Sequence, residues 1–355
     1  MHGFAKVSLR RISTRLLVPL LVVALAPLVG ATAAYAYGAP IDLGTLYGGY
    51  SAAWSINDSE QIAGTSDWMP VVWVNRQIHV LALPPGFVGG TVRDINNHGT
   101  MVGHVWDGNG GLRAAMWTTT DYNYVSLLED GSTAQVSGAY GINDRGTATG
   151  FVNEGYGNEP VSYVEGIYQL VDPARNPGNA YTLSMRSTAS RFDWVVVGTT
   201  YWNDGQPRAY TNLYNQNGYN GNVWLPAISG TKSSAWAVNY DATRVFGNSD
   251  AGNENHPTMW TQDGSGGWTA FDLGMPSGGG GYINDSNPAG TRTAGGGTDG
   301  QGQPVAFYWQ DGVGSIALSD LGGTCGTRAA TGINLGSQIV GWGCAGGAQH
   351  AVLWN

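Results

Sequence analysis

The feature that most constrains the fold of this chain is a repeat of about 46 residues. Seven copies of one pattern align on a glycine, at intervals of 39, 47, 48, 49, 48 and 46 residues. The first three copies begin WSINDSEQIAG, RDINNHGTMVG and YGINDRGTATG, the sixth contains GYINDS, and the fourth keeps only WVVVG. Such a period indicates an array of small similar units. We number them repeats 1 to 7 by their glycines, which are Gly64, Gly103, Gly150, Gly198, Gly247, Gly295 and Gly341.

Each repeat is predicted to form four β-strands, because short β-rich runs alternate with clusters of turn residues. Asn57-Asp58 and Asn143-Asp144 follow an isoleucine and suit a tight hairpin, since Asn and Asp tolerate positive φ. The first strand therefore ends at the asparagine and the second near the aligned glycine. A third strand ends in an aromatic residue, and a fourth completes the unit. The third-strand aromatics, which we expect in the core, are Trp73, Trp117, Tyr163, Tyr210, Trp260, Trp309 and Trp354.

A period near 46 with four strands per unit is typical of β-propeller blades, with a linear solenoid as the main competitor. The two ends of the chain favour the propeller. The last repeat stops after its third strand, and the segment Ile41–Leu46 resembles an isolated fourth strand. We therefore predict an all-β fold, a seven-bladed β-propeller of four-stranded antiparallel blades. In this fold the ring is closed by pairing of the N-terminal and C-terminal strands.

Residues 1–36 have the layout of a secretory signal peptide. Four basic residues precede an apolar run from Leu16 to Val29, and Ala34-Tyr35-Ala36 fits a cleavage site. An uncleaved membrane anchor is the alternative. We expect a signal peptide at 1–36, the propeller at 37–355, and a secreted protein, either extracellular or periplasmic.

The charge of residues 37–355 restricts the class of partner. They contain 12 basic and 25 acidic side chains, a net charge of −13, because the first 36 residues hold four of the 16 Lys and Arg. An acidic surface without a basic stripe argues against nucleic acid and against anionic membranes. We expect a monomer that binds a glycan or an extracellular protein, and no cofactor.

The repeats resemble those of the bacterial extracellular HAF family, named after a His-Ala-Phe triplet before the last tryptophan of each unit. The resemblance rests on GIND at Gly141–Asp144, DLGTL at Asp42–Leu46 and His350-Ala351-Val352 before Trp354, and it covers residues 37–355. The triplet's histidine is replaced by Pro or Arg in most copies. The resemblance implies secretion and a propeller-like fold, and it implies no particular activity.

The loops after the aligned glycines are the candidate binding face. Six of them contain an acid three to six residues after the glycine, and several place an aromatic residue nearby. Aromatic faces and hydrogen-bonding carboxylates together suit a sugar ring. The alternatives are that these residues only shape tight loops, or that they coordinate a metal, for which we find no recognised spacing. The candidate ligand-binding residues are Asp67, Trp68, Trp106, Asp107, Glu154, Tyr156, Trp202, Asp204, Asp250, Asp299 and Trp342.

The two cysteines predict one disulfide. Cys325 precedes the first strand of repeat 7, and Cys344 follows its hairpin partner. Folding this hairpin brings the two side chains together, and an oxidising compartment permits the bond.

Three functions remain open at this point, and the third of them is a scaffold in the cell envelope. One is a secreted binding propeller that contacts glycans or protein partners. Another is a polysaccharide-active enzyme, a lyase or a glycoside hydrolase, with its site at the channel mouth. For the enzyme, the first residues to consider are Arg93, Arg328 and Tyr282. No G-x-S-x-G, H-E-x-x-H or P-loop pattern is present.

Overall fold

The computed structural model describes ten stretches of the chain. They are residues 34–128, 136–155, 158–164, 167–170, 182–186, 194–201, 204–215, 218–252, 254–263 and 265–355. The chain divides into two units, Met1–Thr32 and Ala33–Asn355, and every described element belongs to the second unit. The predicted signal peptide therefore lies outside the described residues, apart from residues 34–36. No helix within these stretches is long and apolar enough to cross a bilayer.

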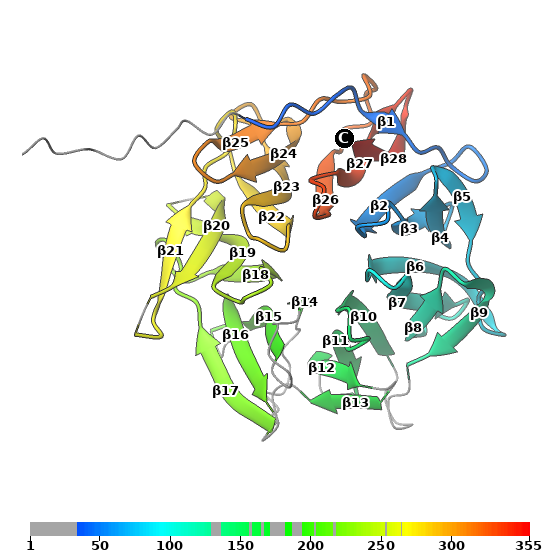
Figure 1. Ribbon diagram of the computed structural model, residues 1–355, viewed down its shortest axis with the longest axis horizontal. Helices are drawn as coiled ribbons and strands as arrows, with labels where there is room; N and C mark the ends of the chain where they lie inside the picture. The colour runs from blue at the N-terminus through cyan, green and yellow to red at the C-terminus, as the bar shows by residue number, and fades with distance from the viewer. Residues whose placement is uncertain are drawn as a thin grey trace, which may run out of the picture. The chain divides into compact units, whose positions relative to one another are not determined.

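All 28 elements of the described residues are β-strands, as expected. Each repeat begins with a strand that lies toward the centre of the unit in Figure 1. These innermost strands are β2 (Ser51–Ile56), β6 (Phe87–Ile95), β10 (Val136–Ile142), β14 (Thr182–Arg186), β18 (Ser233–Val238), β22 (Gly281–Ser286) and β26 (Ala329–Ile333).

A second strand pairs antiparallel with each innermost strand. These are β3 (Ile62–Ser66), β7 (Thr100–Asp107), β11 (Ala148–Asn153), β15 (Trp194–Tyr201), β19 (Arg244–Ala251), β23 (Arg292–Thr298) and β27 (Ile339–Ala345). The aligned glycine lies where the two strands come closest. A Cβ added to Gly64 would overlap the carbonyl oxygen of Ala52, and one added to Gly341 would overlap that of Ala329. The repeat keeps glycine there because any side chain would push the two strands apart.

The third and fourth strands lie farther from the centre. The third strands are β4 (Met69–Val74), β8 (Leu112–Thr118), β12 (Asn158–Val164), β16 (Pro207–Asn215), β20 (Glu254–Gln262), β24 (Pro304–Gln310) and β28 (Ala348–Trp354). The fourth strands are β5 (Gln77–Val80), β9 (Asp121–Leu127), β13 (Ile167–Leu170), β17 (Gly218–Trp224), β21 (Trp268–Asp272), β25 (Gly314–Ala317) and β1 (Ile41–Asp42).

The strands form five four-stranded sheets and one eight-stranded sheet. The larger sheet contains the strands of repeats 2 and 3, which are joined by a single parallel pairing of Val136 with Leu112. In the sheet of repeat 7, β1 pairs antiparallel with β28, and Ile41 lies opposite Leu353. The N-terminal strand therefore completes the sheet of the last repeat. It is shorter than the predicted segment Ile41–Leu46, because Gly44 takes a positive φ of 72° two residues after the strand ends.

The hydrophobic core is divided among the spaces between neighbouring sheets. Trp73, Trp117 and Trp260 are at most 1% exposed and Trp309 is 6% exposed, which confirms their prediction as core residues. One cluster joins residues of repeat 1 to the sheet of repeat 7. It contains Leu43, Ala53, Ile56, Ile62, Val71, Trp73, Val340, Ala351 and Leu353. The first and last repeats are therefore packed against each other.

The sixth repeat departs from the sequence alignment. Its Ile283-Asn284-Asp285 resembles the hairpin motif of the other copies, but Ile283 pairs with Gly295 and thus occupies the position of Ala53 in repeat 1. The hairpin begins three residues later, at Asn287, whose N–H donates to the carbonyl oxygen of Arg292. Asn284 consequently lies inside the innermost strand.

Candidate functional site

Five of the six acids predicted to line a binding face accept hydrogen bonds from groups of their own repeat. Asp67 accepts hydrogen bonds from the backbone N–H groups of Tyr47 and Tyr50, at 2.9 and 3.1 Å. Asp107 and Asp299 each accept hydrogen bonds from the backbone N–H groups two and four residues later, which are those of Asn109 and Gly111 and those of Gln301 and Gln303. Asp204 accepts from the N–H of Gln206 and from the guanidinium of Arg208. Asp250 accepts from the N–H of Lys232. Glu154 follows β11 and is half-buried. The five aspartates are thus at least partly engaged within their own repeats.

The predicted aromatic residues divide into two groups. Trp68 is 65% exposed in the turn between β3 and β4, and its ring lies 6.3 Å from that of Trp106. The ring of Tyr50 also contacts that of Trp68, with ring centroids 5.1 Å apart. Trp342 belongs to strand β27 instead, and its ring contacts Trp54 at 5.0 Å. Tyr156 and Trp202 lie outside the described residues.

Among the predicted aromatic residues that the structure describes, Trp68 and Trp106 are the two whose rings lie together. With Tyr50 they form a small aromatic group at the ends of β2, β3 and β7, which we call the rim group. Its members meet edge to face, an arrangement that aromatic pairs prefer. The exposed ring of Trp68 is available for an external contact.

A second candidate region lies between the innermost strands. A cavity of about 80 Å³ is lined by side chains of β2, β6, β10, β18, β22 and β26, and we call it the channel cavity. Six lining residues occupy the same place in their repeats, three positions before the turn asparagine. They are Trp54, Arg93, Tyr140, Trp236, Asn284 and Thr331.

Arg93 is the central residue of the channel cavity. Its guanidinium carbon lies 3.8 Å from the ring centroid of Trp54 and 5.4 Å from that of Tyr140. Burial lowers the pKa of Arg93 and raises the pKa of Tyr140. Arginine side chains keep their proton in folded proteins. Arg93 is therefore a cation held between two aromatic rings.

His104 lies beside this pair in β7. Its ring is 6.2 Å from that of Tyr140 and 6.3 Å from that of Trp106, and its buried Nδ1 has no hydrogen-bond partner. Burial and the charge of Arg93 lower the pKa of His104 to about 3. The imidazole is consequently neutral at physiological pH. The aromatic contacts continue from the rim group through His104 to the channel cavity.

The opposite end of the innermost strands carries a ladder of asparagines. Nδ2 of Asn334 donates to the carbonyl oxygen of Asn57 at 3.1 Å, Asn57 donates to Asn96 at 3.0 Å, and Asn96 to Asn143 at 3.0 Å. Asn57 and Asn96 thus each connect their repeat to the next one, and Asn334 connects repeat 7 to repeat 1. These turns border a second cavity of about 200 Å³, the turn-face cavity.

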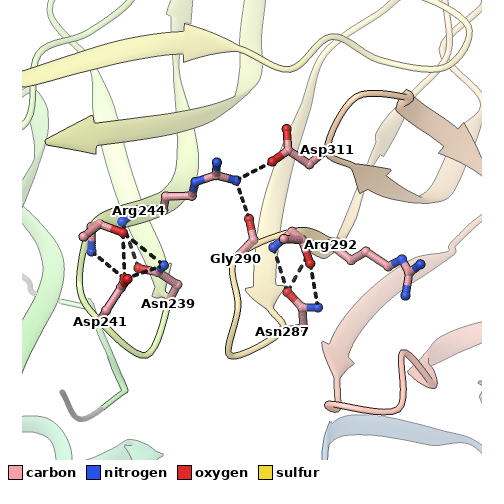
Figure 2. Close-up of polar contacts among 9 residues, drawn as sticks. Asn239, Asp241, Arg244, Asn287, Gly290, Arg292 and Asp311 are labelled. Atoms are coloured by element: carbon pink, nitrogen blue, oxygen red, sulfur yellow. Dashed lines mark hydrogen bonds and ion pairs between the residues drawn. The ribbon is translucent and has the colours of Figure 1, made fainter. Parts of the chain in front are cut away.

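Repeats 5 and 6 are joined on this face by an arginine. Figure 2 shows Nη1 of Arg244 donating to the carbonyl oxygen of Gly290 and to the carboxylate of Asp311, both at 2.9 Å. Asn239 and Asn287 in the same view accept hydrogen bonds from backbone N–H groups of their own hairpins. Arg244 is thus bound by the neighbouring repeat and the two asparagines by their own hairpins, so these polar groups are structural.

The described residues contain no cluster of three or more His, Cys, Asp or Glu side chains that could hold a metal ion. The predicted disulfide is present between Cys325 and Cys344, with a Cα–Cα distance of 5.3 Å. Arg328 forms an ion pair with Asp320 at 2.9 Å, and Tyr282 is 37% exposed. Neither of these two lines the channel cavity.

Arg93 was among the residues predicted from the sequence, but the set of equivalent residues to which it belongs was not. The sequence does contain a pattern that indicates this set, because a large or polar residue stands three positions before the turn asparagine in repeats 1, 2, 3, 5 and 6. A column of such residues on innermost strands converges on one cavity. In repeat 6 the motif INDS suggests that Asn284 is the turn asparagine, and this alignment places it outside the column.

Comparison with known proteins gives a fold but no family. No family model matches the chain, and no curated protein matches its sequence. Among solved structures, the extracellular domain of the one component system BT4673 from B. thetaiotaomicron aligns with a TM-score of 0.53 at 10% identity, over 90% of this chain and 40% of that chain. Oligopeptidase B from Trypanosoma brucei gives 0.51 at 10% identity, over 85% of this chain and 42% of that one.

A prolyl endopeptidase structure aligns with a TM-score of 0.50 at 12% identity, over 77% of this chain and 42% of that chain. These similarities agree with the repeated four-stranded antiparallel sheets around a common centre. The fold is a β-propeller. The propeller spans about two fifths of the length of each of these three proteins, and identities of 10–12% extend the likeness to the fold alone.

Proposed function

We propose that this protein is a secreted binding propeller that contacts extracellular glycans through the rim group. The observation that carries the proposal is the exposed indole of Trp68, flanked by Tyr50 and Trp106. A flat apolar ring with polar loops around it matches a sugar, which has an apolar face and a hydroxylated edge. An extracellular protein is the alternative partner.

The proposal includes a seven-bladed ring. Two four-stranded halves of the eight-stranded sheet count as separate blades, since a single pairing connects them. Pairing of β1 with β28, and packing of Trp73 against the sheet of repeat 7, support closure between the first and last blades. A closed ring leaves only short sheet edges exposed, which favours a monomer.

Export is supported by the disulfide and by the leader-like residues 1–36. Disulfides persist in oxidising compartments and are rare in the cytosol. Membership of the HAF family, suggested by GIND and by His350-Ala351-Val352, is part of the same proposal.

Binding is favoured over catalysis because the acids of the channel cavity are occupied. Asp94 accepts hydrogen bonds from Ser55 Oγ and from the backbone N–H of Ile142. Asp285 accepts one from the N–H of Ile333. Both carboxylates hold neighbouring repeats together, whereas a glycoside hydrolase needs two that face its substrate.

One observation favours the second candidate, a polysaccharide-active enzyme. Arg93, Tyr140 and His104 lie together beside the channel cavity, which is a group that could neutralise a carboxylate and move a proton. Against this, the pKa of His104 is about 3 and that of Tyr140 is raised, so neither group is a ready base at neutral pH.

The test is a glycan-array screen of residues 37–355, followed by assays for reducing and unsaturated ends on each glycan that binds. Binding without product supports the proposal, and product formation supports the enzyme. Trp68→Ala should weaken binding about tenfold or more, because one aromatic stacking contact is lost. Tyr124→Ala is the matched control, since Tyr124 is 56% exposed on β9 and lies outside the rim group. Equal binding by wild type and Trp68→Ala would refute the role of the rim group.

A further inference from the structure

The channel cavity contains a cation that the fold itself does not use. Among the described residues, no carboxylate and no carbonyl oxygen lies within ion-pair or hydrogen-bond distance of the Arg93 guanidinium; its contacts are with the rings of Trp54 and Tyr140. Arg208, Arg244 and Arg328, in contrast, each form an ion pair at 2.7 to 2.9 Å. An arginine has five N–H donors, and the side chain of Arg93 is half-buried in the wall of the channel cavity, where a ligand can reach these donors.

The two aromatic rings hold the guanidinium in place without occupying its donors. A guanidinium over an aromatic face is attracted by the ring quadrupole, and its N–H groups point outward in the plane of the cation. The cation is thus positioned before any ligand arrives. This geometry matches the fork of a planar carboxylate, to which arginine can donate two parallel hydrogen bonds.

We propose that the channel cavity is a binding site for a carboxylate, with Arg93 as its anion-binding residue and Trp236 as the surface for the apolar part of the ligand. This site goes beyond the glycan-binding rim group, and neither depends on the other.

The cavity has room and polar groups for such a ligand. About 80 Å³ is several times the ~10–15 Å³ that one water molecule needs, so a carboxylate and part of a small ring can enter. Trp236 lies in repeat 5, in the wall of the same cavity, and its indole nitrogen is fixed by Oδ1 of Asn248 at 3.1 Å. Asn284 donates through Nδ2 to the carbonyl oxygen of Ala330, which leaves its Oδ1 to accept from a ligand hydroxyl.

The charges around the cavity limit the ligand to a single carboxylate. Asp94 and Asp285 also line it, and each already accepts hydrogen bonds from the following repeat. Residues 37–355 have a net charge of −13, which repels a polyanion over a distance of about a Debye length. A neutral body with one carboxylate satisfies Arg93 without this repulsion.

A free sugar acid and the acidic residue of an otherwise neutral oligosaccharide share this chemistry, and the experiment separates them. Residues 37–355 are titrated by calorimetry with glucuronate, with methylglucuronosyl-xylotriose, with xylotetraose and with tetragalacturonate. We expect binding of one or both of the first two, at least tenfold tighter than of the other two, because a charge-assisted hydrogen bond is lost with the neutral sugar. Glucuronate alone indicates a small-molecule site, and the xylan fragment alone indicates a glycan site.

Arg93→Gln should reduce the binding of the acidic ligands to the level of xylotetraose. Arg113→Gln removes the same charge from β8, outside the channel cavity, and should leave binding within twofold of wild type. Far-UV circular dichroism and the melting temperature verify folding. If Arg93→Gln does not fold, Arg93→Lys takes its place and should also weaken the binding of the acidic ligands, because lysine lacks the planar fork of arginine. Wild type is then also titrated with the methyl ester of glucuronate, which lacks the charge and should bind more weakly than glucuronate.

The proposal is overturned if wild type binds neither acidic probe, if it binds xylotetraose or the methyl ester equally well, or if folded Arg93→Gln retains full binding. Trp68→Ala distinguishes this site from the rim group. It should leave glucuronate binding unchanged, and a parallel loss of glucuronate binding in this variant would assign the acid to the rim group and refute the channel site.

Discussion

The indole nitrogen of Trp73 donates a hydrogen bond of 3.0 Å to the carbonyl oxygen of Leu43, thirty residues earlier in the chain. Leu43 in turn donates its backbone N–H to the carbonyl oxygen of Ala351 in β28, at 2.9 Å. A tryptophan of repeat 1 thus binds the segment that completes the sheet of repeat 7. Three other tryptophans make the same bond to the preceding repeat: Trp117 to Ala82, Trp260 to Pro226 and Trp354 to Ser319.

Replacing Trp73 with Phe should therefore destabilise the propeller by about 2–4 kcal/mol. The change leaves the carbonyl oxygen of Leu43 without its donor and opens a small cavity beside a fully buried ring. The free energy of unfolding in urea measures the effect. Trp68→Phe is the control and should stay within about 0.5 kcal/mol of wild type, because Trp68 is mostly exposed. Equal stability of the two variants would contradict the role assigned to the indole hydrogen bond.

The disulfide should stabilise repeat 7 by about 3 kcal/mol. It links residues 19 positions apart, and the loop-closure model gives this value for a loop of that length. Cys344 is fully buried and its carbonyl oxygen accepts a hydrogen bond from the N–H of Gly323, so its side chain cannot move far after reduction. The melting temperature should fall in the presence of a reductant. Cys325→Ala/Cys344→Ala should already melt at the lower temperature and should not respond to the reductant.

Asn96 tests the asparagine ladder. Its Oδ1 accepts from the N–H groups of His98 and Thr100, and its Nδ2 donates to the carbonyl oxygen of Asn143. Asn96→Ala should cost about 2–4 kcal/mol in urea unfolding, because several buried polar groups lose their partners at once. Asn97 belongs to the same turn and binds Asp144, but it is exposed.

Asn97→Ala should therefore cost at most about 1 kcal/mol. A loss as large as that of Asn96→Ala would show that the exposed turn contacts, and not the buried ladder, connect the repeats.

The repeated features of this fold could be read from the sequence, because they recur seven times under the same physical constraint. The aligned glycines mark positions where a Cβ would overlap the neighbouring strand, and the third-strand tryptophans fill the spaces between sheets. The disulfide followed from hairpin geometry. The binding residues are different, because a site is built from the places where repeats differ.

Asp107 and Asp299 illustrate why the role of the predicted acids does not follow from the sequence alone. An aspartate next to glycines in a loop can face a ligand or accept hydrogen bonds from the N–H groups two and four residues later, and both have the same sequence pattern. The structure shows the second arrangement at both positions. Arg93 shows the converse, since only the register of the innermost strands places it between Trp54 and Tyr140.

His104 gives the propeller a specific sensitivity to acid. Burial and Arg93 lower its pKa in the folded state to about 3, whereas an unfolded histidine titrates near 6.5. Between these values the unfolded chain binds a proton that the folded chain does not, so the free energy of unfolding decreases as the pH falls from about 6.5 toward 3. The contribution at pH 4 is up to about 3 kcal/mol.

His104→Phe removes this titration and should make unfolding in urea less dependent on pH between 7 and 4. His98→Asn is the control, because His98 is exposed in a turn, and it should keep the pH dependence of the wild type. The imidazole resonances of His104 should also stay constant from pH 8 to pH 5 in the folded protein. A midpoint for His104 near pH 6, or an unchanged pH dependence in His104→Phe, would mean that water or a counter-ion reaches the ring and that the space beside Arg93 is open to solvent.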